Sequence, residues 1–387
     1  MKKNNMIFFL ISALAYVSAH LYFYLKLTHI LNFGVATDFI IGLSILIMAV
    51  SHVPVHWYSF RGDRKLVAFL TYVSSLWAAF LIIYFPTAII FELYDFVIKT
   101  GLFDKNLTSL LLSPAQTFVI PSIISIAVNS YGYIEATNLQ VERLTIYTSK
   151  LPEKVNKITV AQISDLHLGI MVGGKKLDRV IREIESAKPD LIVSTGDLVD
   201  GVVRHIIHYT DRLKKLQAWM GKFAVLGNHE FYGGLKHSLK FTEDSGFTVL
   251  RGEVVNIKGI LNIAGVDERA DTNKNNNSNM KNTIDVLSGI PQNIFTLLLK
   301  HRADMDSSSS GLFDLQLSGH THKGQMFPVS LFTMFIFKHH SGYKKLPKGS
   351  DLYISRGAGT AGTPIRFLSK PEITIIDIVS EKSSTIV

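Results

Sequence analysis

The hydrophobic and polar positions divide the chain into two parts of different character. Before about residue 134, long apolar runs follow one another with few charges, whereas from Glu142 short apolar runs alternate with amphipathic ones. Runs of about 20 apolar residues suit helices that cross a bilayer, and short alternating runs suit the strands and helices of a water-soluble domain. The pattern therefore predicts a membrane domain over residues 1–140 and a soluble domain over residues 141–387.

Four apolar segments of the first part are long enough to span a bilayer. They lie near residues 6–27, 39–57, 66–98 and 107–134. A cleaved signal peptide is the alternative for the first segment, but its apolar run is longer than the core of a signal peptide and further spans follow it. We therefore predict a four-helix transmembrane domain.

Basic residues in the short connections determine the predicted orientation. Lys2 and Lys3 precede the first span, and Arg61, Arg64 and Lys65 lie between the second and third. Because cytoplasmic loops carry an excess of Lys and Arg, the N-terminus and the whole soluble domain are predicted to lie in the cytoplasm.

Ionisable residues in or beside the spans raise the alternative of transport or sensing, since such residues are often functional. They are His20, His52, His56, Glu92 and Asp95. Most of them lie near the ends of spans and no repeat joins them, so a plain anchor is favoured.

The second part reads as a layered α/β domain, because strand-like and helix-like runs alternate along it. The predicted strands are 144–147, 158–163, 191–194, 222–225, 248–251, 254–257, 260–266 and 372–379, with another beginning at Ser355. The predicted helices are 176–187, 209–220 and 235–245. Strands that follow one another late in the chain predict some antiparallel pairing.

The composition limits the kinds of site that the chain can form. It contains no cysteine, so disulfides and thiolate metal sites are excluded, and a metal must be bound through nitrogen and oxygen. The formal net charge of +9 favours anionic lipid surfaces or phosphate-bearing substrates, although a basic surface that merely keeps the protein soluble is an equally good explanation.

Metal-type side chains follow the apolar runs of the second part. Asp165 and His167 are two positions apart at the expected end of a strand, so both should point to one face and meet at one ion. Asp197 follows a glycine after the next strand, where a carboxylate can bridge two cations, and Asn228 offers a neutral oxygen after a third. The remaining candidates are His301, His320 and His322. Each pair alone is more often a turn or cap, but together they predict a binuclear metal site at the carboxyl ends of the strands.

These residues resemble the pattern of the calcineurin-like metallophosphoesterases, which is D-x-H, G-D-x-x-D, G-N-H-[DE], a lone His and G-H-x-H. The pattern is met here, with no core residue missing, by Asp165 and His167, by Gly196, Asp197 and Asp200, by Gly227, Asn228, His229 and Glu230, by His301, and by Gly319, His320 and His322. The match runs from about residue 141 to the C-terminus and is similar to the bacterial membrane-anchored branch. A related group of that branch cleaves the pyrophosphate of UDP-2,3-diacylglucosamine.

The resemblance implies a four-layer α/β/β/α sandwich, two divalent metal ions (Mn, Fe or Zn) and a metal-bridging hydroxide that attacks phosphorus in line. It implies that the first ion is held by Asp165, His167, Asp197 and His322, and the second by Asp197, Asn228, His301 and His320. His229 matches the residue that protonates the leaving oxygen and Asp200 the carboxylate that orients it, with a helix N-cap as the alternative for Asp200. Lys323 stands where the family pattern would have glycine, which puts the substrate pocket in question.

Two features bear on the substrate. Residues 326–337 form a Phe-rich apolar segment followed by lysines and histidines, which is typical either of a buried core element or of a membrane-facing lid beside the metals. Arg356 and Arg366 suit a substrate phosphate, although a surface ion pair is the commoner fate of such residues.

The sequence thus predicts an integral protein of a bacterial plasma membrane whose catalytic domain faces the cytoplasm. It is expected to be a metal-dependent phosphohydrolase of the phosphodiesterase or pyrophosphatase type, with the bilayer and a phosphate-containing substrate as partners and a lipid-linked pyrophosphate as the preferred substrate. The alternatives are a tethered nucleotide or protein phosphoesterase and a non-catalytic membrane scaffold. Nothing in the sequence indicates nucleic-acid binding, a particular leaving group or an oligomeric state.

Overall fold

The computed structural model divides the chain into two compact units, Met1–Ile134 and Glu135–Val387. It describes residues 3–58, 64–100, 105–201, 203–267, 282–304 and 308–382. The division falls a few residues before the predicted boundary, because the end of the last apolar helix is bonded to the second unit. Lys176 donates to the carbonyl of Ala136 over 2.7 Å, and Arg179 donates to that of Thr137 over 2.9 Å.

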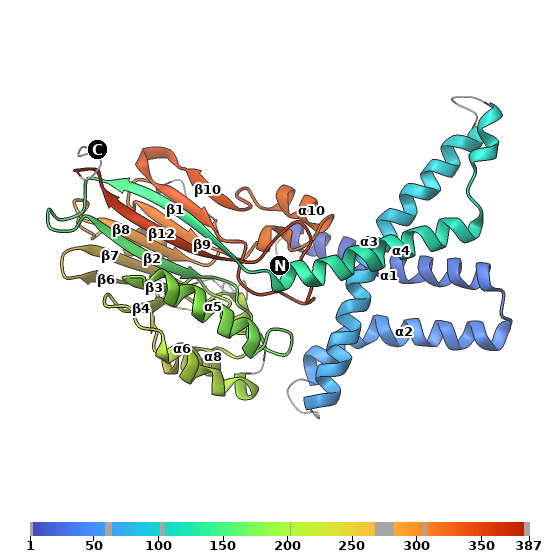
Figure 1. Cartoon of the computed structure of the whole chain (residues 1–387), viewed down its shortest axis with the longest axis horizontal. Coiled ribbons are helices and arrows are strands. Elements are labelled where there is room, and N and C mark those ends of the chain that lie inside the picture. Colours follow the sequence, from blue (N-terminus) through green and yellow to red (C-terminus); the bar gives the residue numbers. More distant parts are fainter. Residues whose placement is uncertain are drawn as a thin grey trace. The chain divides into compact units, whose positions relative to one another are not determined.

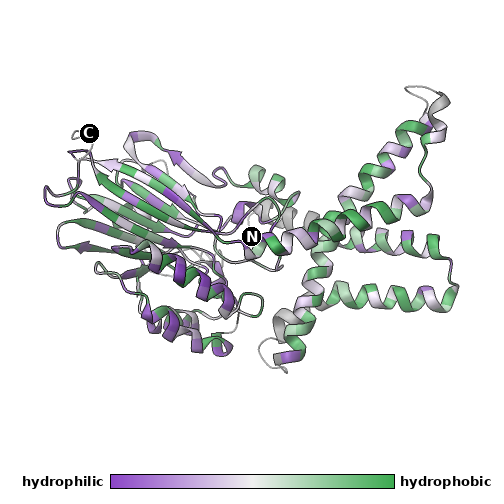
Figure 2. Cartoon of the chain, in the orientation of Figure 1, coloured by the Kyte–Doolittle hydropathy of each residue, from purple (hydrophilic) through white to green (hydrophobic). Residues whose placement is uncertain are grey.

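The first unit consists of long apolar helices, which Figure 2 colours mostly as hydrophobic. They are α1 (Lys3–Leu31), α2 (Val35–Tyr58), α3 (Arg64–Thr100) and α4 (Pro114–Thr137), with a short 3-10 helix, η1 (Lys105–Leu110), before α4. Each predicted span falls largely within one of these four helices. Among the described residues, Lys65–Thr100 and Pro114–Thr137 are long and apolar enough to cross a membrane, and Val35–Val50 is a shorter apolar segment.

Ionisable side chains of the first unit are bonded within it. Lys26 forms an ion pair with Glu92, and the hydroxyl of Tyr22 donates to the same carboxylate over 3.3 Å. Asp95 accepts from the backbone N–H of Leu112 over 3.0 Å. The contacts of Glu92 join α1 to α3, and that of Asp95 joins α3 to the segment between η1 and α4.

The second unit contains two mixed six-stranded sheets (Figure 1). The first sheet has, in order, β1 (Gln140–Thr148), β12 (Glu372–Ser380), β2 (Lys157–Ile163), β3 (Leu191–Ser194), β4 (Lys222–Ala224) and β5 (Thr248–Val249). The second sheet has β10 (Gly342–Lys345), β11 (Asp351–Ile354), β9 (Leu315–Ser318), β8 (Phe295–Lys300), β7 (Leu261–Val266) and β6 (Glu253–Ile257). The strands β2, β3 and β4 run parallel to one another, as do β7, β8, β9 and β11.

The two sheets pack face to face around a shared apolar core. Val160 and Leu191 of the first sheet lie in the same buried cluster as Leu297 and Leu315 of the second. The other face of the first sheet is covered by α5 (Gly174–Ala187), α6 (Thr210–Lys215) and α8 (Leu235–Asp244), and that of the second by α9 (Thr283–Leu287). Strands β7 and β8 are covered on both faces and are almost wholly buried, which explains why their sequences are nearly continuous apolar runs.

The predicted α/β class and the antiparallel pairing of β6 with β7 are confirmed, but two predicted elements were wrong. The helix predicted over 209–220 ends at Lys215, because Leu216 adopts extended backbone and buries its side chain in the core. The strand predicted from Ser355 lies earlier, at β11, because residues 351–354 pair with residues 315–318 of β9. The neighbouring β10 was not predicted, since its mostly exposed residues show no apolar alternation.

Candidate metal centre

The proposed ligands come together at one edge of the sandwich, each just after the carboxyl end of a strand. Asp165 and His167 follow β2, and Asp197 follows β3. The other four are Asn228 after β4, at the start of α7 (Asn228–Tyr232), His301 after β8, and His320 and His322 after β9, where η4 (His322–Gly324) begins. Parallel strands place their carboxyl ends side by side, so residues more than 150 positions apart in the chain reach the same place.

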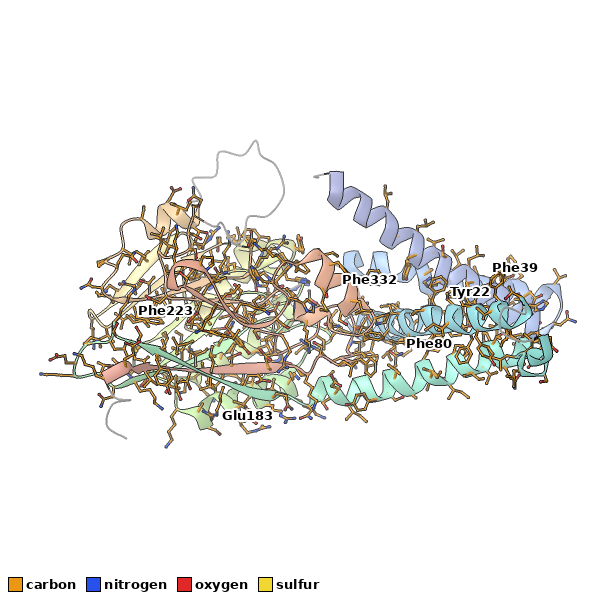
Figure 3. The ribbon with its side chains drawn as sticks, turned by 90° about the horizontal axis from the view of Figure 1, so that it is seen from above. Tyr22, Phe39, Phe80, Glu183, Phe223 and Phe332 are labelled. Atoms are coloured by element: carbon orange, nitrogen blue, oxygen red, sulfur yellow. The ribbon has the colours of Figure 1, made fainter. Side chains whose placement is uncertain are left out.

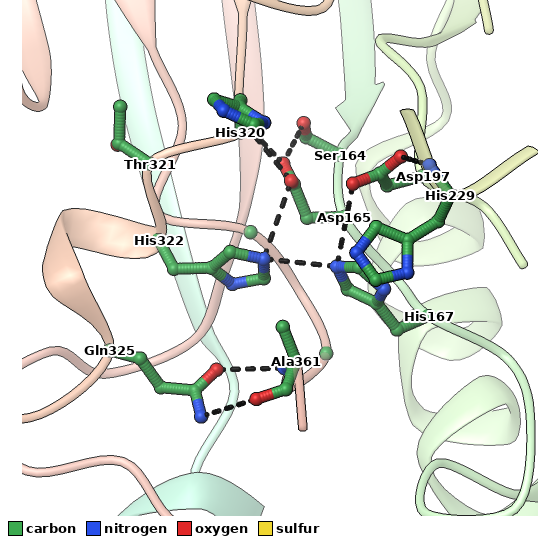
Figure 4. A network of polar contacts seen from close by, with 12 residues as sticks. Ser164, Asp165, His167, Asp197, His229, His320, Thr321, His322, Gln325 and Ala361 are labelled. Carbon is green, nitrogen blue, oxygen red and sulfur yellow. Dashed lines mark hydrogen bonds and ion pairs between the residues drawn. The ribbon is translucent and has the colours of Figure 1, made fainter. Parts of the chain in front are cut away.

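A first group of ligand atoms is formed by Asp165, His167 and His322 (Figure 4). Nε2 of His322 lies 3.0 Å from Nε2 of His167 and 3.4 Å from Oδ1 of Asp165. The Asp165 carboxylate also accepts the backbone N–H of His320 over 3.0 Å and contacts the hydroxyl of Ser164.

A second group is formed by Asp197, His301 and His320. Oδ2 of Asp197 lies 3.2 Å from Nε2 of His301, and that nitrogen lies 3.2 Å from Nδ1 of His320. The same Oδ2 atom lies 3.8 Å from Nε2 of His167 in the first group. The carboxylate of Asp197 therefore stands between the two groups, as a bridging ligand must.

The side chains converge through left-handed backbone and not through strand periodicity, contrary to the prediction for Asp165 and His167. The strand β2 ends at Ile163, and both residues follow it with positive φ angles, 49° for Asp165 and 50° for His167. Three further proposed ligands, Asp197, His320 and His322, have φ angles of 52°, 72° and 48°. Non-glycine residues adopt this conformation at a cost of about 1–3 kcal/mol each, and clusters of such residues occur at functional sites.

The pKa shifts favour neutral imidazoles at His167, His320 and His322 and an ionised carboxylate at Asp197. Burial lowers the pKa of His167, and burial with the nearby His301 lowers that of His320 to about 2. Burial and the Arg366 guanidinium hold the pKa of His322 well below its ordinary value. Burial alone would raise the pKa of Asp197, but the neighbouring histidines outweigh it and hold that pKa well below its usual range. Neutral imidazoles and an ionised carboxylate are the protonation states that bind metal ions.

The residues fit two divalent cations. Oδ1 of Asn228 is buried, and no described residue hydrogen-bonds to it, so a neutral oxygen is available as a ligand directly after β4. Burial and the charge of Asp197 raise the pKa of Asp165, which shows that the two carboxylates are costly to keep ionised together without a cation. Imidazole nitrogen with carboxylate and amide oxygen is a donor set that suits transition-metal ions better than Ca²⁺.

His229 and Asp200 form a hydrogen-bonded pair beside the two groups. Nδ1 of His229 lies 2.8 Å from Oδ1 of Asp200, and its ring stacks edge-on against that of His167 with centroids 4.6 Å apart. Burial would lower the pKa of His229, but the bond to Asp200 and the charge of Asp197 raise it to about 9. The Asp200 carboxylate therefore favours the protonated form of the His229 imidazole.

Glu230 organises the turn that carries Asp197, a role that the sequence did not reveal. Its buried carboxylate accepts the backbone N–H groups of Asp197, Leu198 and Gly227 over 2.9, 2.7 and 2.8 Å. A fourth N–H, that of Val199, donates over 3.2 Å. The only signal in the sequence is the acidic fourth position of the Gly-Asn-His-Glu motif.

The two arginines behave differently. Arg356 forms ion pairs with Glu142, whose side chain is 45% exposed, and with Glu372, which is buried, so the predicted surface ion pair is found with Glu142 alone of these two. Arg366 is fully buried and its guanidinium lies against the proposed ligand His322, so the prediction of a surface ion pair was wrong for this residue. Burial lowers the pKa of Arg366 to about 10, which still leaves it charged at neutral pH.

Residues 326–337 do not form a buried core element. They contain α10 (Val329–Ile336), of which no residue is buried, and which begins just after η4. Lys323, in η4, has a φ angle of 51°, which is why glycine would be favoured at this position. The loop after Lys323 is closed by Gln325, whose amide accepts from the N–H of Ala361 over 2.7 Å and donates to its carbonyl over 2.9 Å (Figure 4).

Comparison with known proteins connects this geometry to a family. Residues 158–324 match the sequence profile of the calcineurin-like phosphoesterases. An uncharacterized metallophosphoesterase of Aquifex aeolicus (strain VF5) is 40% identical over 256 residues, which are 66% of this chain and 97% of that protein. An uncharacterized metallophosphoesterase of Bacillus subtilis (strain 168) is 31% identical over 265 residues, 65% of this chain and 90% of that protein. A Danio rerio protein named as a transmembrane protein with a metallophosphoesterase domain is 28% identical over 67% of this chain and 62% of its own length.

Proposed function

Since the chain belongs to the calcineurin-like metallophosphoesterase family, we propose that it is a membrane-anchored phosphohydrolase that uses two divalent metal ions. The observation that carries this proposal is the position of Asp197, whose Oδ2 atom lies 3.2 Å from His301 in one ligand group and 3.8 Å from His167 in the other. A carboxylate shared in this way suits a pair of cations that act together on one phosphate group.

The first ion would be held by Asp165, His167, Asp197 and His322, and the second by Asp197, Asn228, His301 and His320. Two such ions supply Lewis acidity, which acidifies the attacking water and neutralises charge on the phosphate oxygens. The left-handed backbone of five of these residues and the hydrogen bonds of Glu230 fix the ligands before the ions bind. Such preorganisation reduces the reorganisation that the reaction requires.

His229 protonates the leaving oxygen in this proposal. Its Nδ1 atom is bonded to Asp200, so the other ring nitrogen, Nε2, is the one that can give a proton to the substrate. Asp200 orients the ring and favours its charged form. A catalytically idle scaffold has no need for a hydrogen-bonded His229–Asp200 pair beside two groups of metal-type ligands, so the enzyme is favoured over a scaffold.

The membrane part of the proposal rests on the first unit. Large apolar side chains point outward from its helices, and examples are Leu14, Phe39, Phe69 and Ile123, which are 60–69% exposed. A water-soluble helical bundle would bury such residues, whereas a bilayer solvates them. We propose four spans with the catalytic unit in the cytoplasm, on the basis of Lys2 and Lys3 at the N-terminus and of the basic residues 61, 64 and 65 between the second and third predicted spans.

A phosphoester or pyrophosphate linked to a lipid is the preferred substrate class, because a site tethered to a bilayer meets lipid headgroups at high local concentration. A nucleotide or phosphoprotein substrate is the alternative. The arrangement of the ligands favours neither of them.

The test is a hydrolysis screen with the full-length protein in detergent and in bilayers. Mn²⁺, Fe²⁺ and Zn²⁺ are supplied separately, and the substrates are a chromogenic phosphomonoester, a chromogenic phosphodiester and a UDP-linked diacyl sugar. We expect metal-dependent hydrolysis that falls by a factor of about 10² or more in Asp197→Asn, since one substitution removes a ligand of both ions. The control is Asp244→Asn, which affects only an exposed ion pair with Lys240. Equal activity of the two variants would contradict the proposal.

A further inference from the structure

The helix α10 exposes large apolar side chains over more than half of its circumference, which is unusual for a helix of a water-exposed domain. The exposed residues are Leu331 (45%), Phe332 (64%), Met334 (59%), Phe335 (90%) and Ile336 (49%), and Figure 3 labels Phe332. The preceding Phe327 is 41% exposed. Such a surface is costly in water and marks a site of association.

The distribution of these side chains identifies the kind of partner. Successive residues are 100° apart, so positions 331, 332, 334, 335 and 336 cover an arc of about 200°, and the small polar residues Ser330 and Thr333 lie on the remaining side. Thr333 bonds to His340 on that side, so the domain holds the helix by its polar face. An apolar face that is wider than the stripe of a groove-docking helix, opposite a polar face held by the protein, is typical of a helix that lies in the interface of a bilayer.

Charge complementarity also points to a lipid surface. The exposed Lys338 directly follows α10 and the exposed Lys344 lies in β10, whereas Lys345 and Lys348 lie toward the end of the sheet away from the ligands. Apolar residues followed by basic ones are the pattern of segments that insert at the interface of an anionic membrane. The chain itself keeps the unit near a membrane if the proposed function is right, since only Asn138 and Leu139 separate α4 from β1.

The helix is bonded directly to the loop that carries the last proposed ligands. The ring of Phe337 stacks edge-on against that of His320 with centroids 5.6 Å apart. The hydroxyl of Thr321 donates to the carbonyl of His340 over 2.6 Å, and Nε2 of His340 lies 2.7 Å from Oγ1 of Thr333 on α10. A bilayer that receives α10 is therefore next to the loop that carries His320 and His322.

We propose that α10 inserts into the acyl region of an anionic lipid surface and so brings the metal centre to phosphoesters that reside in that surface. This inference rests on the proposed function for the presence of a membrane and of hydrolysis. It adds to the proposed function that α10 is the segment that contacts the lipid and that the substrate is amphiphilic.

The absence of cysteine makes the test direct, because a single cysteine can be introduced and labelled with a nitroxide. The full-length protein with Phe335→Cys is reconstituted into vesicles of phosphatidylcholine and phosphatidylglycerol. The accessibility of the label to oxygen, which concentrates in the bilayer, is compared with its accessibility to a water-soluble nickel chelate. The control is Tyr147→Cys in β1, an aromatic position that is 59% exposed. Tyr147 lies near the carboxyl end of β1. Since β1 is parallel to β12 and β12 is antiparallel to β2, this end of β1 is at the edge of the sheet opposite the ligands, which follow β2.

We expect the label at 335 to be accessible to oxygen and shielded from the chelate, and the label at 147 to be accessible to the chelate. Accessibility of position 335 to the chelate would overturn the inference. So would shielding from both reagents, which indicates that α10 packs on protein, or dipolar broadening between labels, which indicates a second copy.

Hydrolysis of an embedded and of a soluble substrate distinguishes failure of this inference from failure of the proposed function. The double variant Phe332→Ser, Phe335→Ser should lose about tenfold in hydrolysis of a phosphoester embedded in vesicles, and should retain hydrolysis of a soluble chromogenic ester. The matched control is Tyr147→Ser, which should retain both. An equal loss on both substrates contradicts the role of α10, whereas absence of metal-dependent hydrolysis in the unmodified protein contradicts the proposed function.

Discussion

The guanidinium of Arg366 lies 2.9 Å from Nδ1 of His322, and both side chains are buried. This contact fixes the position of the imidazole ring, with Nε2 toward Asp165 and His167. The other N–H groups of Arg366 donate mainly to backbone carbonyls, including those of Gly359 and Arg356. Arg366 is therefore a positioning residue for one of the two ligand groups.

The variant Arg366→Lys keeps a cation but loses the planar fork that meets these acceptors. We expect the affinity for one of two bound Mn²⁺ ions to fall by about 10–100-fold, the usual effect of losing a residue that orients a ligand, while the other ion binds normally. Titration calorimetry measures both affinities. Arg356→Lys, which affects ion pairs with Glu142 and Glu372, is the control. Equal weakening of both ions in Arg366→Lys would argue for a general loss of structure.

Gly319 leaves room for the Asp165 carboxylate. A Cβ atom at this position would overlap Oγ of Ser164 and Oδ2 of Asp165. We expect Gly319→Ala to displace Asp165 and to reduce both metal content and hydrolysis by at least about tenfold, since misplacement of about 1 Å costs up to 10²-fold. Gly289→Ala is the matched control, because a Cβ there meets no atom within 4 Å. Metal content is measured by elemental analysis, and an unchanged content in Gly319→Ala would refute the prediction.

Asp200 determines the pH range over which His229 is a proton donor. With Asp200 present the pKa of His229 is raised to about 9, so activity that requires the protonated ring should decline as the pH rises through that region. Removing the charge in Asp200→Asn lowers the pKa of His229 and moves the alkaline limb of the profile of kcat to lower pH. The effect should be largest for substrates with poor leaving groups, because good ones need no proton. An unmoved limb would assign the titration to another group.

Glu230 stabilises the turn after β3 through four backbone N–H groups. In Glu230→Gln an amide NH₂ replaces one acceptor oxygen and faces backbone donors. Burial raises the pKa of Glu230 to about 7, so the carboxylate is charged above that pH. There we expect the free energy of unfolding to fall by about 2–3 kcal/mol, since a hydrogen bond to a charged group contributes about 1.5–3 kcal/mol. Thermal unfolding with and without Mn²⁺ measures the change. Glu185→Gln, at an exposed position of α5, should change stability by less than about 0.5 kcal/mol.

The proposed ligands could be found from the sequence because their signals are local. Each follows an apolar strand directly, and the carboxyl ends of parallel strands lie at one edge whatever the details of the sheet. The residue types then restrict the chemistry, since a set rich in imidazole and carboxylate without cysteine suits only some metals. The long apolar helices of the first unit were predictable for the same reason, because length and composition suffice to identify them.

Other properties depended on contacts between residues far apart in the chain, and only the tertiary structure decided them. The predicted strand geometry of Asp165 and His167 was wrong because bonds to the loop after β3, from Asp165 N to Gly196 O and from His167 N to Asp197 O, hold their backbone left-handed. Arg366 is buried because the loops around His322 and Gly359 enclose it, and nothing near it in sequence indicates that. An apolar run such as residues 326–337 can be buried or exposed, and its burial depends on what the rest of the fold places against it.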